Sequence, residues 1–353
     1  MKPFNKEIRI GNRLVGKGHP SYIIADIGAN FDNDMNKAKA LIDAAKEAGA
    51  DCAKFQSFLA DKIVSGKGFA SMTLKGVHGT WGRGVDEVFR DAEFPRGWHQ
   101  ELADYCRKVG IDFSSSPYDS EAVDLCVEVG VPFIKIGSGD ITWHEMLTYI
   151  AKTGKPLFLA TGDATMSEID EAVRVIQDAG CSDLVLMQCI TNYPSLVESA
   201  NINVLKNYQA AFDILTGYSD HSPGSVVVLG SIALGACTIE KHFTLSKKDA
   251  GPDHNHSMDV MELTKMVKDI RLLESAMGGT QKFVVEEESE TVIVQRRGLY
   301  SKRDIKAGEV INADDIDVLR PALGIPPKYK PVIAGKKAVK DIEKGLPIFW
   351  DCI

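Results

Sequence analysis

The sequence predicts an α/β protein built on a (β/α)8 TIM barrel, with an N-terminal β-hairpin and a small β-rich C-terminal domain. Apolar, strand-like runs alternate eight times with segments of helical periodicity between about Ser21 and Met277. Several of these helical segments end in a glycine that leads into the next strand, as at Gly49 and Gly110. A doubly wound open sheet is the alternative, but no GxGxxG motif follows the first strand.

The elements follow one another in a regular order. The hairpin is expected at residues 8–15, around a Gly11-Asn12 turn. The eight strands are expected at residues 22–27, 52–56, 111–115, 133–136, 157–160, 184–189, 212–216 and 237–243. Between the strands, apolar residues recur at helical spacing, for example at positions 38, 41, 42, 45 and 48.

The 353 residues exceed one ordinary domain. We expect the barrel and its hairpin at residues 1–280, and a polar, acidic linker at residues 281–296. Short strand-like pieces and turns then fill residues 297–353. Two related phrases there, residues 303–308 and 340–345, indicate a small, internally repetitive β-rich fold.

Composition narrows the range of partners and compartments. The apolar share of 44% and charged share of 25% are typical of a globular protein. A net charge of −8 argues against nucleic-acid binding, and no run reaches the roughly 18 apolar residues of a membrane span. The seven cysteines are scattered without a CxxC pair, as reduced core cysteines would be. We therefore expect a cytoplasmic protein without nucleic-acid or membrane partners.

Two histidines point to a metal. His221 and His242 each follow an apolar run, and neighbouring parallel strands would bring both to the active rim of a barrel. A lone histidine on an apolar strand is usually a core group, but Glu240 and Asp253 nearby favour a metal here. His78, His99 and His144 are expected at the surface. His254 and His256 would add ligands, although a polar loop is the commoner explanation for them.

Two lysines point to an anion. Lys54 and Lys135 are flanked by apolar residues, and buried lysines need anionic partners. Together with Ser116 and Ser138 they would hold a phosphate or a carboxylate. The alternative is a pair of structural salt bridges to Asp26 or Glu240.

Nine short motifs, in order along nearly the whole chain, carry a resemblance to a known family. Among them are Ile24-Ala-Asp-Ile-Gly-Ala-Asn30, Ile134-Lys-Ile-Gly-Ser-Gly-Asp140, Gly217-Tyr-Ser-Asp-His221 and Glu240-Lys-His-Phe-Thr244. The chain resembles the sialic acid synthases, which form N-acetylneuraminate, legionaminate or pseudaminate from phosphoenolpyruvate and an N-acyl hexosamine. Residues 302–308 and 319–321 resemble that family's antifreeze-like SAF domain, which has a β-clip fold.

The resemblance implies a role for individual residues. His221 and His242 would bind a divalent metal, most often Mn²⁺, with Mg²⁺ or Co²⁺ as alternatives. Phosphoenolpyruvate would be held by Lys54, Ser116, Lys135 and Ser138. Asp26 and Glu240 would join the two lysines in catalysis, and Tyr193, Ser219 and Asp253 would contact the sugar. Arg320 would reach the partner's sugar site in a domain-swapped homodimer.

Three positions depart from the family pattern: Asp26 stands for a glutamate, Ala160 for a phosphate-binding serine and Phe31 for a histidine. These three departures affect the expected details of catalysis and the identity of the acceptor sugar. No motif in the sequence identifies that sugar. N-acetylmannosamine, 2,4-diacetamido-2,4,6-trideoxyhexoses and phosphorylated sugars differ at carbons 4 and 6, where residues 66–84 and 161–165 are expected to contribute. Two other functions remain open, a Schiff-base aldolase using Lys54 or Lys135 and a non-catalytic sugar- or phosphate-binding protein.

Overall fold

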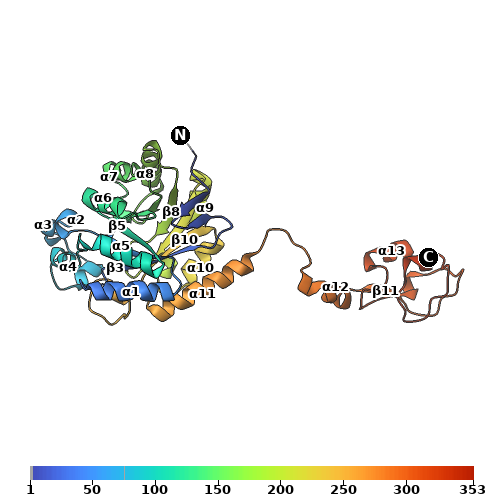
Figure 1. Cartoon of the computed structure of the whole chain (residues 1–353). Coiled ribbons are helices and arrows are strands. Elements are labelled where there is room, and N and C mark those ends of the chain that lie inside the picture. The colour runs from blue at the N-terminus through green and yellow to red at the C-terminus, as the bar shows by residue number, and fades with distance from the viewer. Residues whose placement is uncertain (1–2, 75) are drawn as a thin grey trace. The chain divides into compact units, whose positions relative to one another are not determined.

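The computed structural model describes residues 3–74 and 76–353, which form two compact units that meet in sequence at Gly278 and Gly279. The first unit is the predicted barrel (Figure 1). Its eight parallel strands are β3 (Tyr22–Gly28), β4 (Cys52–Ser57), β5 (Asp112–Pro117), β6 (Ile134–Ile136), β7 (Leu157–Ala160), β8 (Leu184–Cys189), β9 (Leu215–Asp220) and β10 (Ala236–His242). They pair in the order β5-β4-β3-β10-β9-β8-β7-β6. At the remaining seam, β5 contacts β6, and Ser114 Oγ donates a hydrogen bond of 2.8 Å to the Phe133 carbonyl.

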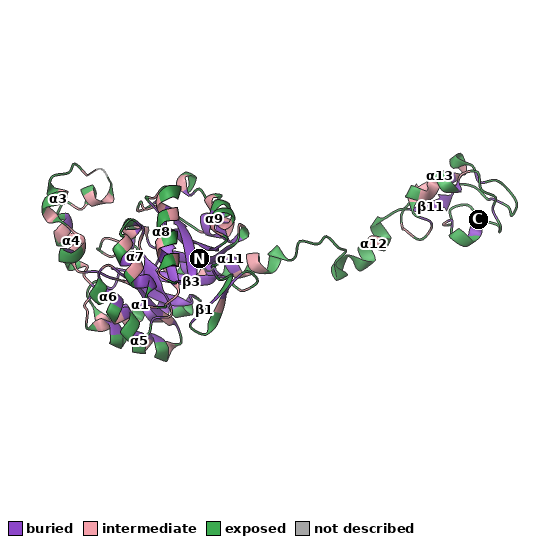
Figure 2. Ribbon diagram, turned by 90° about the horizontal axis from the view of Figure 1, so that it is seen from above, coloured by how far each residue is buried: buried purple, intermediate pink, exposed green. Residues whose placement is uncertain are grey.

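Helices surround the strands, with their outer faces exposed and the strands buried (Figure 2). The longer helices are α1 (Met35–Glu47), α5 (Trp98–Val109), α6 (Ser120–Glu128), α7 (His144–Ala151), α8 (Met166–Asp178), α9 (Val204–Phe212), α10 (Val226–Ala233) and α11 (Val260–Met277). Local sequence defines their starts: Asp34 caps α1, and Thr165 and Glu168 form a reciprocal capping box on α8. No helix among the described residues is long and apolar enough to cross a membrane.

One strand was predicted wrongly. The seventh was expected at residues 212–216, but β9 begins at Leu215, because Phe212 is the last residue of α9. Asp213 ends that helix in the left-handed conformation, with φ of +47°, so the chain turns before the strand starts. As a result of this shift, Ser219 and Asp220 belong to the strand itself.

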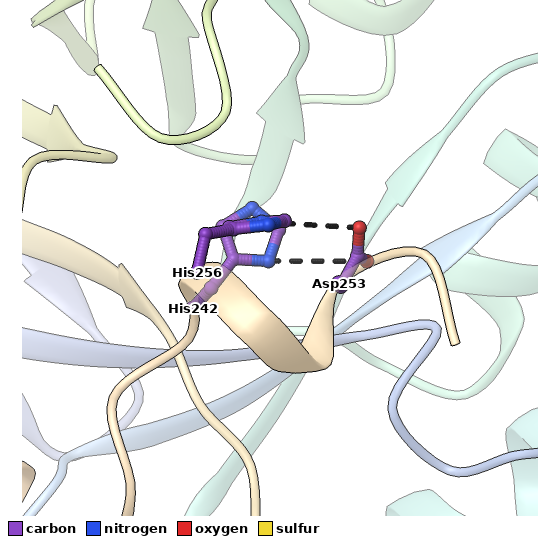
Figure 3. Close-up of side chains that lie close together, drawn as sticks. All are labelled: His242, Asp253 and His256. Atoms are coloured by element: carbon purple, nitrogen blue, oxygen red, sulfur yellow. Dashed lines mark ion pairs between the residues drawn. The ribbon is translucent and has the colours of Figure 1, made fainter. Parts of the chain in front are cut away.

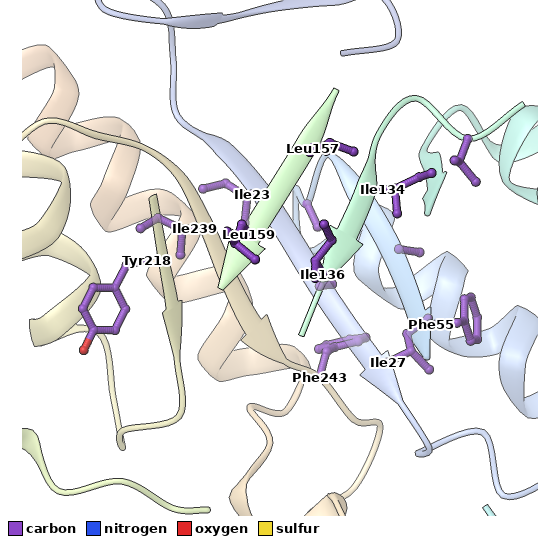
Figure 4. Close-up of a cluster of buried hydrophobic side chains, with 14 of the residues drawn as sticks. Ile23, Ile27, Phe55, Ile134, Ile136, Leu157, Leu159, Tyr218, Ile239 and Phe243 are labelled. Carbon is purple, nitrogen blue, oxygen red and sulfur yellow. The ribbon is translucent and has the colours of Figure 1, made fainter. Parts of the chain in front are cut away.

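Strand alternation divides the barrel residues between two hydrophobic clusters. Along β3, Tyr22 and Ile24 belong to an inner cluster, whereas Ile23 and Ile27 belong to the cluster between strands and helices (Figure 4). Successive side chains of a strand face opposite sides, so Asp26 shares the inner side with Tyr22 and Ile24. The same alternation places Lys54 of β4 on the inner side with Cys52.

The N-terminal hairpin completes the inner cluster. Strands β1 (Glu7–Ile10) and β2 (Arg13–Gly16) pair antiparallel, as predicted. Ile8, Ile10 and Val15 are buried in one cluster with residues from the first half of the barrel strands, such as Phe133 and Phe158, whose rings stack at 4.2 Å. The hairpin therefore covers the end of the barrel where the strands begin.

The second unit has its own small core. Strands β11 (Gly298–Ser301) and β12 (Ile316–Leu319) pair antiparallel, followed by the short helix α13 (Lys330–Ile333). Ile305 and Ile342 pair through two backbone hydrogen bonds of 2.9 Å, which joins the two related phrases recognised in the sequence. The expected linker, residues 281–296, is partly ordered, since it contains α12 (Ser289–Gln295).

We predict that Ile10→Ala lowers the free energy of unfolding of the barrel by about 2–5 kcal/mol, because Ile10 is fully buried and its truncation leaves a cavity. Arg9→Ala is the matched control, since Arg9 is exposed on the same strand. Urea unfolding followed by circular dichroism measures both. Equal effects of the two variants would show that the hairpin does not pack as described.

Candidate active site

The carboxyl ends of the barrel strands enclose a cavity of about 350 Å³. It is lined by every site residue predicted in the barrel: Asp26, Lys54, Ser116, Lys135, Ser138, Tyr193, Ser219, His221, Glu240, His242 and Asp253. Arg320 lies exposed at the end of β12 in the second unit. Eleven residues from distant parts of the sequence therefore converge on one cavity, at the end of the barrel where such folds carry their active sites.

A cluster of buried opposite charges forms the floor of this cavity. Lys54 Nζ lies 2.9 Å from Asp26 Oδ2 and 3.8 Å from Glu240 Oε1, and Lys135 Nζ lies 3.5 Å from the same Glu240 oxygen. Burial would lower the pKa of Lys54, but the two carboxylates outweigh it and raise that pKa above its ordinary value. The salt bridges that the sequence left as an alternative to an anion site are thus present in the unliganded protein.

Hydrogen bonds orient the two carboxylates. The Gly28 amide donates to Asp26 Oδ1 and the Gln56 side-chain amide donates to Asp26 Oδ2, both at 3.1 Å. Ser219 Oγ donates to Glu240 Oε1 at 3.1 Å, whereas Glu240 Oε2 is buried without a hydrogen-bond partner. A buried carboxylate oxygen without a donor is costly, so it marks a place where a ligand group fits.

Two hydroxyls lie beside Gly162, two residues after Ala160. The Gly162 amide donates to Ser138 Oγ at 3.0 Å, and Ser138 also shares a side-chain hydrogen bond with Cys189. Thr191 Oγ1 is buried without a hydrogen-bond partner among the described residues, and it lines the same cavity. A side chain at position 162 would collide with both hydroxyls, at 2.1 Å from Thr191 Oγ1 and 2.9 Å from Ser138 Oγ. Thr191 thus offers a hydroxyl to the cavity in which Ala160 lacks one.

The third group of side chains is suited to a metal ion. One ligand atom from each of His242, Asp253 and His256 lies within 4.8 Å of the others (Figure 3). His242 Nδ1 and His256 Nε2 are buried without hydrogen-bond partners. Burial, followed by electrostatic coupling to the neighbouring histidines, holds the pKa of His242 well below its ordinary value and that of His256 at about 4. Neutral imidazoles present the lone pairs that a metal needs.

His221 completes this group from β9. Its ring centroid lies 5.3 Å from that of His242, and its Nδ1 lies 2.8 Å from the Ile190 carbonyl oxygen. A carbonyl only accepts, so Nδ1 must carry a proton, and in the neutral ring it is Nε2 that offers a lone pair. Tyr193 packs on this ring, with centroids 4.2 Å apart. The structure therefore brings the two predicted histidines together and adds His256, which sequence reasoning had attributed to a polar loop.

The loop that carries Asp253 and His256 is anchored by its neighbour His254. His254 is fully buried, its Nδ1 lies 2.6 Å from Thr244 Oγ1, and its Nε2 lies 3.0 Å from Asp32 Oδ1. The acidic group of Asp32, Asp249 and His254 could also hold a metal by distance, but Lys37 forms ion pairs with both carboxylates. That position is already neutralised, and its role is to hold the loop.

Two further expectations are corrected. His99, expected at the surface, is buried with its Nε2 2.8 Å from Ser57 Oγ, because α5 turns it toward β4. Phe31 faces the core, where its ring lies 5.7 Å from those of Phe94 and Trp98, and it does not line the cavity. The departure at position 31 therefore concerns packing.

Known proteins resemble this chain over almost its full length. The model of the NeuB family matches residues 41–282, and the SAF domain model matches residues 296–353. An uncharacterized protein of Methanocaldococcus jannaschii is 40% identical over 98% of both chains. The N,N'-diacetyllegionaminic acid synthase of Campylobacter jejuni is 38% identical over 91% of this chain and 97% of its own.

A solved structure shares the fold as well as the sequence pattern. The N-acetylneuraminic acid (sialic acid) synthetase from Leptospira borgpetersenii, solved in complex with citrate, is 28% identical and aligns with a TM-score of 0.73. The alignment covers 83% of this chain and 97% of that one. With a barrel, a charged cavity and both family models in the expected order, the chain belongs to the NeuB family.

Proposed function

We propose that the protein condenses phosphoenolpyruvate with an N-acyl hexosamine of the N-acetylmannosamine type, giving a nine-carbon nonulosonic acid and phosphate in a metal-dependent reaction. Relatives named as legionaminic, pseudaminic and N-acetylneuraminate-9-phosphate synthases support the reaction class. The observation that carries the proposal is the convergence on one cavity of a buried lysine pair and of three side chains, His242, Asp253 and His256, whose ligand atoms lie within 4.8 Å of one another.

The donor set fits a divalent cation. His221 and His242 are the proposed ligands, and His256 and Asp253 lie close enough to complete the site. Imidazole and carboxylate donors suit Mn²⁺, and they also accept Mg²⁺ or Co²⁺. When bound, the cation would polarise the aldehyde of the open-chain sugar as a Lewis acid.

The lysine pair is proposed to hold phosphoenolpyruvate. Lys54 and Lys135 would exchange part of their contact with Asp26 and Glu240 for the phosphate and carboxylate of the substrate, aided by the hydroxyls of Ser116 and Ser138. The ordinary structural alternative is that these charges only neutralise one another. Lys54 holds Asp26 at 2.9 Å, but the contacts of both lysines to Glu240 are longer, at 3.8 Å and 3.5 Å, so exchange is expected first at Glu240.

The bonds that form and break in the proposed reaction define the roles of the two carboxylates. C3 of phosphoenolpyruvate attacks the sugar aldehyde carbon, and water adds at C2, which carries the phosphate oxygen. Asp26 and Glu240 accept the proton that this water loses and return one to the new hydroxyl on the sugar. The C2–O bond to phosphate then breaks and the C2 hydroxyl becomes the carbonyl; the proton of that hydroxyl leaves with the phosphate, and the lysines offset the charge of the departing phosphate.

The remaining predicted residues are proposed to bind the acceptor sugar, one of them across a dimer. Tyr193, Ser219 and Asp253 line the cavity and are proposed to contact the sugar. Arg320 is proposed to do so from the partner's SAF domain in a domain-swapped homodimer. We also place the protein in the cytoplasm, without nucleic-acid or membrane partners, on the grounds of its composition and charge.

The Schiff-base alternative is less well supported. An imine-forming lysine must lose its proton, and such lysines have a depressed pKa. The carboxylates of Asp26 and Glu240 raise the pKa of Lys54 despite its burial, which keeps the amine charged. Borohydride trapping with a carbonyl substrate would reveal an imine if one formed.

We predict that His242→Ala removes bound Mn²⁺ and lowers kcat/KM for phosphate release at least about 100-fold, since even outer-shell partners of metal ligands cost 10–100-fold. His144→Ala, outside the cavity at the start of α7, is the control and should keep both. Metal content after dialysis is measured by mass spectrometry of the ion. Retention of one Mn²⁺ per chain by His242→Ala would refute the assignment.

We predict that Lys135→Met raises KM for phosphoenolpyruvate at least about 30-fold, because loss of one partner from a buried charge pair costs about 2–5 kcal/mol. The exposed Lys152→Met is the matched control. Initial rates and thermal unfolding are measured together. A loss of stability with unchanged KM would show that Lys135 only neutralises Glu240.

We predict that Arg320→Ala and His242→Ala, each inactive alone, regain roughly a quarter of wild-type activity when co-expressed, since half of randomly mixed dimers would hold one intact site. This result requires Arg320 to act in the partner's site. Mixed dimers, isolated by two affinity tags, that stay inactive would show that Arg320 serves its own chain or no site at all.

A further inference from the structure

One wall of the cavity is apolar. It is formed by Phe58, Ile63, Val77, Trp81, Val88 and Phe89, which we call the apolar wall. All six come from the segment that follows β4, which contains α2 (Ala60–Ile63), α3 (Gly66–Ala70), η1 (Val77–Thr80) and α4 (Val85–Asp91). Figures 1 and 2 show these short helices gathered together outside the barrel. This insertion interrupts the regular strand–helix alternation, and its apolar side faces the cavity rather than the core.

Aromatic contacts hold the apolar wall together. The ring of Phe89 lies 5.3 Å from that of Phe58 and 6.2 Å from that of Trp81, within the range of favourable aromatic contact. The two arginines of the same segment do not line the cavity: Arg83 pairs with Asp91 at 2.7 Å and Arg90 with Asp61 at 2.9 Å. These two arginines are thus engaged with carboxylates outside the cavity, whereas the aromatic side chains line it.

The apolar wall lies beyond the groups of the proposed reacting end. The proposed metal ligand His242 and the lysines lie within the strands, whereas the apolar wall belongs to a connection beyond the end of β4. In the proposed reaction the acceptor aldehyde at C1 lies with His242 and the lysines. An acceptor that extends from there toward the connection after β4 would present carbons 5 and 6 to the wall.

This chain's own lining places no permanent positive charge on the wall. Of the described residues that line the cavity, only Lys54 and Lys135 carry a permanent positive charge, and both lie on the floor. His78 borders the wall, and burial lowers its pKa. Within this lining, a phosphate on C6 would find no permanent cation on the wall, and a C6 hydroxyl would face mainly apolar side chains, with the His78 imidazole beside them.

We propose that the acceptor is an unphosphorylated 6-deoxy N-acyl hexosamine, whose C6 methyl group packs on the apolar wall. This inference rests on the function proposed above and narrows its substrate. In this proposal Trp81, Phe89 and Val77 determine which acceptor is preferred. They favour 6-deoxy sugars over 6-hydroxylated and 6-phosphorylated sugars that have the same reacting end.

The test compares three acceptors that differ only at C6: 2-acetamido-2,6-dideoxymannose, N-acetylmannosamine and N-acetylmannosamine 6-phosphate. Phosphate release from phosphoenolpyruvate with Mn²⁺ gives kcat/KM for each with the wild-type protein. We expect kcat/KM for the 6-deoxy sugar to exceed that for the hydroxylated sugar by about 10- to 100-fold, the range over which hydrophobic pockets discriminate, and kcat/KM for the 6-phosphate to be lowest.

A preference for the 6-phosphate or 6-hydroxyl sugar would overturn this inference and leave the proposed function intact. If none of the three releases phosphate, a 2,4-diacetamido-2,4,6-trideoxyhexose is the fourth acceptor: release with it would support both proposals, and no release with any of the four would overturn both.

A pair of variants tests the wall itself. Val77→Lys places a cation on it and should lower kcat/KM for the 6-deoxy sugar at least tenfold while raising that for the 6-phosphate. Met72→Lys is the matched control, because Met72 is 61% exposed on the same segment and does not line the cavity. Val88→Lys repeats the change from α4 in case Val77→Lys does not fold. Unchanged acceptor ratios in folded wall variants would show that the wall does not contact the sugar.

Discussion

The structure depends on neutralising charge inside a barrel. Lys54 and Lys135 project inward because strand alternation leaves them on the same side as the apolar residues that fill the barrel's other end. An isolated ammonium could not remain ionised there, and the carboxylates of Asp26 and Glu240 make it possible. The same four groups that solve this folding problem are those with which an anionic substrate would exchange contacts.

Much of this arrangement follows from pattern alone. The barrel, the hairpin and the convergence of His221 with His242 all follow from alternating periodicity, because parallel strands of one barrel deliver their carboxyl ends to the same rim. The start of β9 was missed because the turn at Asp213 uses a left-handed residue that is not glycine, and no pattern marks it. The error was small in sequence, yet it decided whether Ser219 lay in a strand.

Loops account for the other omissions. His256 joins the cavity only because His254, two residues earlier, is held by Thr244 and Asp32 from other parts of the chain. The apolar wall likewise arises from a long connection whose short helices carry weak periodicity, so nothing in the sequence distinguishes its cavity-facing side. Long-range contacts that fix a loop leave little local signal. The role proposed for Arg320 is harder still to test from one chain, because it would require a second one.

One glycine ties the first strand of the barrel to the loop after the last. Gly28 has φ of +55°, and a β-carbon there would lie 2.6 Å from Asp253 Oδ2 and 3.3 Å from His242 Nδ1. The adjacent Ala29 amide donates to that same carboxylate oxygen at 3.2 Å. Even a methyl group at position 28 would push the carboxylate away from the histidines. Over evolutionary time, Gly28 and Asp253 should therefore be inherited as a unit, and a lineage that abandons one would be expected to redesign the other.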